Sequence, residues 1–165
     1  MLIQKHIKLT SLPDFFNAEL ETLSETLHAP FEQKFFEEFS QSFKEQFISY
    51  VEHTLNVKNL QISEGWLNCI KYAGSSNAFD WHNEDGVGVN DGKNEGAYVC
   101  IMWVRGMYDK GGLFKYINDD GNIINVPLDL PSLMVIKKDT MHSVEDYTGT
   151  EYRMSFNFNF DAEII

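Results

Sequence analysis

Residues 151–160 read EYRMSFNFNF, and this stretch predicts the architecture of the chain. Bulky apolar side chains alternate with polar ones, which is the period of a β-strand. The apolar face carries Tyr152, Met154, Phe156, Phe158 and Phe160, and the other face carries Arg153, Ser155, Asn157 and Asn159. The apolar face suits packing against helices. The polar face would be unusual in a core, so in a barrel we expect it to point at a ligand.

Short segments rich in β-branched and aromatic residues precede this strand, and clusters of Gly, Asn and Asp separate them. About eight strands in about 95 residues, with no helical period between them, predict an all-β sandwich or barrel. The expected strands are 66–72, 79–84, 97–104, 112–117, 123–127, 132–137, 142–147 and 151–160.

The first 60 residues have a helical pattern instead. Ser11 to Asp14 (SLPD) resembles a capping box with proline in the first turn, and apolar residues at helical spacing follow it. After Pro30, phenylalanines recur every fourth residue, which predicts one apolar helix face: Phe31, Phe35, Phe39, Phe43 and Phe47. We therefore expect a single domain, 1–165, in which a helical support (1–60) packs on one sheet of a β core (61–165).

Composition excludes several classes of function. The chain has 165 residues, 43% of them hydrophobic, and a net charge of −12, which disfavours nucleic acid or an anionic membrane as the main partner. Its two cysteines, Cys69 and Cys100, lie in apolar segments, so we expect reduced core thiols and no disulfide framework. The N-terminus is too mixed for a signal peptide, and no apolar run approaches a membrane span, so we expect a cytoplasmic protein.

Residues 79–89, FDWHNEDGVGV, place an imidazole and two acids in a strand-like segment. His82 and Glu84 are two residues apart, so on a strand they project from the same face, whereas Asp85 points away unless the strand bulges. A third ligand can come from His142, at the start of a later strand. Two imidazoles and one carboxylate are the facial triad of non-haem Fe(II) sites, with open positions for substrate and oxygen.

The order of these motifs resembles the Fe(II)/2-oxoglutarate-dependent dioxygenase superfamily, and within it the prolyl-4-hydroxylase-like members. The similarity spans about residues 67–160: Tyr72-Ala73-Gly74 before His82-x-Glu84, then Gly111-Gly112, then His142, then Arg153-x-Ser155. The resemblance implies a double-stranded β-helix, or jelly roll, that binds Fe(II), 2-oxoglutarate and O2, with ascorbate as a further candidate cofactor.

The resemblance also implies roles for residues. His82, Glu84 and His142 hold the metal, with Asp85 as fallback ligand because the family usually has Asp where Glu84 stands. Arg153, Ser155 and Tyr72 hold 2-oxoglutarate. The implied reaction hydroxylates a protein side chain, such as prolyl, or a small amino-acid-like substrate, with release of succinate and CO2.

Several alternatives stay open. The chain could instead be a non-catalytic jelly-roll or cupin-like protein that binds a metal or another ligand. Residues 87–96, rich in Gly and Asn, are either a lid over the substrate or a plain solvated loop. Both a monomer and a homodimer are compatible with the sequence.

Overall fold

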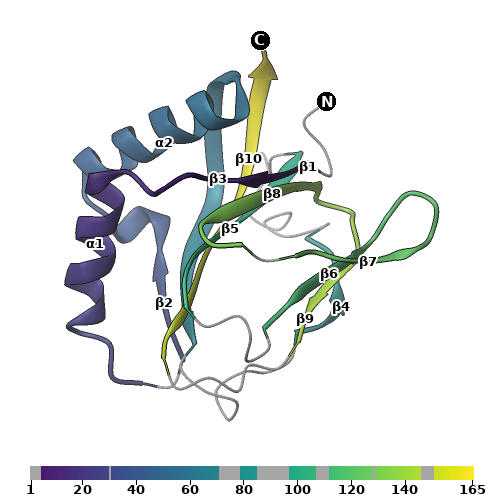
Figure 1. Cartoon of the computed structure of the whole chain (residues 1–165). Helices are drawn as coiled ribbons and strands as arrows, with labels where there is room; N and C mark the ends of the chain where they lie inside the picture. Colours follow the sequence, from purple (N-terminus) through teal and green to yellow (C-terminus); the bar gives the residue numbers. More distant parts are fainter. Residues whose placement is uncertain are drawn as a thin grey trace.

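A computed structural model describes residues 5–29, 31–70, 79–84, 97–106, 112–127, 129–145 and 151–165. The described part of the chain is mainly β, with two antiparallel sheets and two α-helices, as predicted (Figure 1). The large sheet has the order β1-β8-β5-β10-β3-β2 and the small sheet the order β4-β9-β6-β7. The strands are β1 (Lys5–Lys8), β2 (Phe31–Phe35), β3 (Val57–Ile70), β4 (Phe79–His82), β5 (Tyr98–Arg105), β6 (Phe114–Ile117), β7 (Ile123–Asn125), β8 (Ser132–Lys137), β9 (His142–Val144) and β10 (Arg153–Ile164).

From β3 onward the chain passes back and forth between the two sheets. β3, β5, β8 and β10 belong to the large sheet, and β4, β6, β7 and β9 belong to the small one. The two sheets face each other in Figure 1, with the helices on the far side of the large sheet. This alternation between two facing antiparallel sheets is the jelly roll that the sequence predicted.

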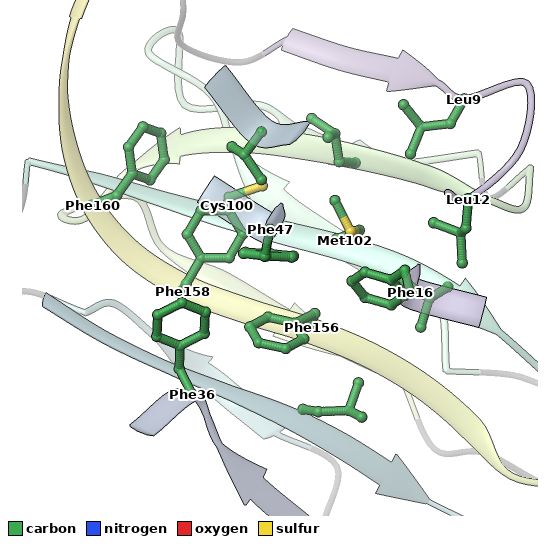
Figure 2. Packing of buried hydrophobic residues seen from close by; sticks show 14 of the residues in the cluster. Leu9, Leu12, Phe16, Phe36, Phe47, Cys100, Met102, Phe156, Phe158 and Phe160 are labelled. Carbon is green, nitrogen blue, oxygen red and sulfur yellow. The ribbon is translucent and has the colours of Figure 1, made fainter. Parts of the chain in front are cut away.

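The last strand has the two faces expected from its alternation. Phe156 and Phe158 are fully buried in the core between the large sheet and the helices (Figure 2). The ring of Phe47, from the second helix, lies 4.8 Å from that of Phe156 between centroids. Aromatic packing of this kind stabilises the contact beyond its buried area. One face of the large sheet is therefore occupied, which leaves its other face for the space between the sheets.

Two helices supply the apolar cover. α1 (Asp14–Ser24) begins after Pro13, whose carbonyl accepts from the backbone N–H of Phe16 at 3.0 Å. No side chain caps this helix, so the predicted capping box at Ser11 is wrong; the extended backbone of Pro13 starts the helix instead. α2 (Gln41–Leu55) has the N-cap Ser40, whose Oγ accepts from Phe43 N–H at 3.1 Å. No helix among the described residues is long and apolar enough to cross a lipid bilayer.

The helix expected from Phe31 to Phe47 is wrong in its first part. Phe31–Phe35 is strand β2, paired antiparallel with β3, and a short 3-10 helix, η1 (Phe36–Glu38), follows it. Only from Gln41 is the segment an α-helix. A spacing of four residues puts side chains on one face of a strand as well as near one face of a helix, so the phenylalanine pattern is compatible with both.

The two cysteines are buried and unpaired, as the sequence predicted. Burial, with a smaller contribution from Glu32, raises the pKa of the Cys69 thiol to about 12, and burial also raises the pKa of Cys100. The thiolate is the nucleophile, so we expect neither cysteine to react with Ellman's reagent in the native protein at about pH 8. Both should react after denaturation in guanidinium. Rapid labelling of the native protein would contradict the buried placement.

Candidate functional site

Two histidines face each other across a strand pair of the small sheet. His82 is the last residue of β4 and His142 the first of β9, and they are directly opposite in the register. Their ring centroids are 4.3 Å apart. Nδ1 of His142 lies 2.9 Å from the carbonyl oxygen of Thr140, which can only accept, so Nδ1 carries a proton, and Nε2, on the side of Glu84, is the atom that can bind a metal.

Glu84 completes this group from beyond the end of its strand. Its Oε1 atom lies 3.4 Å from Nε2 of His82 and 3.4 Å from Nε2 of His142. The predicted strand 79–84 ends at His82, and a hydrogen bond from Glu84 N–H to the Lys138 carbonyl, 2.8 Å, holds the acid beside the imidazoles. One ligand atom from each of the three residues lies within 4.8 Å of the others. Asp85, the fallback ligand, lies outside the described residues.

The carboxyl group of Glu84 is ionised at neutral pH. Burial acts to raise its pKa, but hydrogen bonds and charge from His142 and His82 outweigh burial and lower the pKa to about 2. Only 12% of the Glu84 side chain is exposed, against 40% for His82. A metal ligand must be deprotonated, so this carboxylate is ready to bind a cation that enters beside His82.

These residues form one wall of a cavity of about 270 Å³ between the two sheets. Apolar side chains of the large sheet and of β6, among them Val99, Ile101 and Phe114, also line it. Polar side chains of β10 form the wall opposite the histidines: Arg153, Ser155 and Asn157. The polar face of β10 thus points into a cavity, as its sequence predicted.

Arg153 is held in place by a glycine. The side chain is buried, and its Nη2 donates to the carbonyl of Gly112 at 2.8 Å. Gly112 has φ +74°, and a Cβ atom there would lie 2.5 Å from Nε of Arg153. No side chain larger than hydrogen fits at this position without moving the guanidinium.

Gly111 and Tyr72, which the sequence also singled out, lie outside the described residues, as does the segment 87–96.

Sequence reasoning missed two members of the cavity wall, Gln33 and Asn68. They lie opposite each other on β2 and β3, and Gln33 Nε2 donates to Asn68 Oδ1 at 2.8 Å. Gln33 was expected on a helix, far from the polar face of β10. Asn68 was expected within a strand, but its orientation toward the cavity depends on the register with Ser155, which the sequence alone does not give.

Comparisons with solved structures show a similar fold in 2-oxoglutarate-dependent oxygenases. A prolyl-4-hydroxylase from Pseudomonas putida has a TM-score of 0.65 at 12% identity, over 98% of this chain and 94% of that chain. HygX from Streptomyces hygroscopicus, solved with nickel and 2-oxoglutarate bound, has a TM-score of 0.61 at 14% identity, over 89% of this chain and 76% of that chain. A prolyl hydroxylase from Trichoplax adhaerens has a TM-score of 0.55 at 9% identity, over 87% of this chain and 74% of that chain. It was solved in complex with a hypoxia inducible factor oxygen degradation domain peptide fragment.

No protein-family model and no curated protein matches the sequence. The likeness is therefore one of fold, and it confirms the jelly roll that the sequence predicted. The chemistry must be argued from the residues of the cavity.

Proposed function

We propose that the protein is an Fe(II)- and 2-oxoglutarate-dependent oxygenase that hydroxylates its substrate and releases succinate and CO2. The observation that carries this proposal is the pairing of two groups on facing sheets of one cavity. His82, Glu84 and His142 offer a metal-binding set, and Arg153 with Ser155 offers a carboxylate-binding set. A purely structural metal site would require the three metal ligands but not a buried arginine and serine on the opposite wall.

The donor set fits Fe(II). Two neutral imidazoles and one carboxylate suit a divalent first-row metal and leave it with a net positive charge, which favours an anionic co-substrate. When bound, Fe(II) would supply the activation of O2, coupled to oxidation of 2-oxoglutarate. Thr140 fixes the tautomer of His142 through its carbonyl, and the backbone of Glu84 is anchored on Lys138. The protein thus orients two of the three ligands before any metal enters.

The opposite wall fits the distal carboxylate of 2-oxoglutarate. A guanidinium binds a carboxylate through two parallel hydrogen bonds, and the Ser155 hydroxyl, on the same face of β10, can add a third. Val99, Ile101 and Phe114 also line the cavity, and an apolar lining strengthens these polar contacts. Tyr72 stays a further candidate from the sequence, and ascorbate stays a candidate reductant.

Ligand-induced stabilisation tests this function. In anaerobic protein, Mn(II) in place of Fe(II), and then the unreactive analogue N-oxalylglycine, should each raise the melting temperature. A ligand at 100 times its Kd adds about 2.7 kcal/mol, which corresponds to roughly 5–10 °C for a chain of this size. Aerobic protein with Fe(II) and 2-oxoglutarate should also release succinate. Stabilisation by metal without any shift from N-oxalylglycine would favour the non-catalytic alternative.

A further inference from the structure

The large sheet ends at β2, and no other described strand pairs with the outer side of this strand. An edge strand presents backbone N–H and C=O groups that can pair with a further strand. The N–H of Phe35 donates to the carboxylate of Glu38 at 2.7 Å, so it points away from β3. Because these groups alternate in direction along a strand, the N–H and C=O of Gln33 and Phe31 point away from β3 as well.

This edge is complementary to a second copy of itself. The strand reads Phe-Glu-Gln-Lys-Phe, and in an antiparallel pair centred on Gln33 each Glu32 lies opposite Lys34 of the second copy. Gln33 then exchanges both backbone hydrogen bonds with its own copy. Glu32 and Lys34 take the pairs without backbone hydrogen bonds, where Cα atoms are only about 4.5 Å apart and opposite charges stabilise the pairing.

The same register pairs the aromatic ends of the strand. Phe31 lies opposite Phe35 of the second copy, and aromatic pairs across two strands stabilise them. In the single chain these side chains are 37% and 47% exposed, which is high for large apolar residues. Self-pairing therefore covers both phenylalanines with each other.

Both charged side chains keep the capacity for a contact with a second copy. Lys34 Nζ lies 3.2 Å from Glu19 Oε1, and the Lys34 side chain is 30% exposed. Glu32 accepts from the N–H of His28 at 2.9 Å and is half-buried. An ammonium has three donors and a carboxylate about four acceptor sites, so each group can bind a further partner.

The opposite edge of the same sheet has the reverse character. Its strand, β1, reads Lys-His-Ile-Lys, and an antiparallel pair of two copies would set Lys5 against Lys8. Like charges directly opposite each other destabilise such a pair, and lysines are a common protection of sheet edges. Two whole chains, each with a net charge of −12, also repel each other. A contact between copies therefore needs a locally balanced segment, and β2 is balanced whereas β1 is not.

We propose that the chain forms a symmetric homodimer by antiparallel pairing of β2 with β2 of a second copy, centred on Gln33. The two large sheets then join into one continuous sheet. Gln33 also lines the cavity, so the strand of the second copy lies beside the cavity of each protomer. This inference is independent of the oxygenase function.

The contact is small, so the dimer should be weak. β2 has five residues, whereas a stable interface usually involves about 20–30 residues on each side. We expect a Kd of about 100 μM, which sedimentation equilibrium of the wild-type chain at concentrations up to about 1 mM measures. A chain that stays monomeric over this range would overturn the proposal.

Charge reversal tests the register of the pair. Glu32→Lys and Lys34→Glu each turn two attractive contacts per dimer into two repulsive ones, so each should weaken the homodimer by at least about 30-fold. Mixing the two variants sets two bases of one chain against two acids of the other, and this mixture should associate with a Kd within about threefold of the wild type. The double variant Glu32→Lys/Lys34→Glu should likewise recover the homodimer.

Lys58→Glu is the matched control. It changes the net charge as Lys34→Glu does and also breaks an exposed ion pair of the same sheet, Lys58 with Glu163 at 3.5 Å, but it lies away from β2. We expect it to dimerise as the wild type does, and circular dichroism checks the fold of every variant. Dimers that persist in both single variants, or single variants that do not associate when mixed, would show that β2 does not form the interface.

Discussion

Replacing Glu84 with alanine is expected to weaken Mn(II) binding by more than about 100-fold. Substituting a residue that only supports a metal ligand typically lowers metal affinity by about 10–100-fold, and losing a ligand should lower it further. The carboxylate is the one anionic group among the three candidate ligands, and its Oε1 lies 3.4 Å from both imidazole Nε2 atoms. Without it, two neutral imidazoles remain, and they hold a hard divalent cation weakly. Anaerobic calorimetric titration with Mn(II), with electron paramagnetic resonance of the free ion as a second readout, measures the loss.

Asp85→Ala is the matched control for this prediction. It removes a carboxylate one residue away, and we expect it to keep the wild-type Mn(II) affinity. The reverse result, in which Asp85→Ala loses the metal and Glu84→Ala keeps it, would show that the fallback ligand is the true one. Both variants should retain the melting temperature of the metal-free protein to within a few degrees, because the main apolar core lies on the other face of the large sheet.

The parts of the structure that the sequence predicted are those with a strong local pattern. The alternation of β10 predicted both the packing of Phe156 against the helices and the placement of Arg153 in a cavity. The spacing of two positions from His82 to Glu84 predicted that they come together, although Glu84 lies beyond the strand end. Its side chain reaches the imidazoles because the backbone is anchored on Lys138, a contact between distant segments that no local pattern encodes.

The parts that the sequence did not predict depend on contacts between distant strands. Phe31 and Phe35 have the spacing of a helix, yet pairing with β3 makes this segment a strand, because tertiary contacts override a weak local preference. As a result Gln33 enters the cavity wall, which a helix over the same residues would not have allowed. Whether Glu84 is the metal ligand, and whether residues 1–60 and 61–165 form one domain, stay predictions.

Gly112→Ala should weaken binding of N-oxalylglycine by about 10–100-fold, because breaking one or two charge-assisted hydrogen bonds costs this much affinity. The affinity for Mn(II) should not change. The added Cβ atom would lie 2.5 Å from Nε and 2.7 Å from Cδ of Arg153, distances that real Cβ atoms do not show. Because Arg153 is buried, its side chain has to shift as a whole, and the guanidinium loses its bond to the Gly112 carbonyl. Calorimetric titration of the Mn(II)-loaded variant measures the effect.

The matched control is Gly121→Ala, because both glycines have a positive φ, +74° at Gly112 and +82° at Gly121, but a Cβ at Gly121 meets nothing within 4 Å. Each substitution should lower the free energy of unfolding by about 1–2 kcal/mol through backbone strain alone. Only Gly112→Ala also displaces Arg153. A loss of N-oxalylglycine affinity in Gly112→Ala that Gly121→Ala does not share therefore reports the position of the guanidinium and not general destabilisation. Equal affinities in both variants would show that Arg153 does not hold the co-substrate.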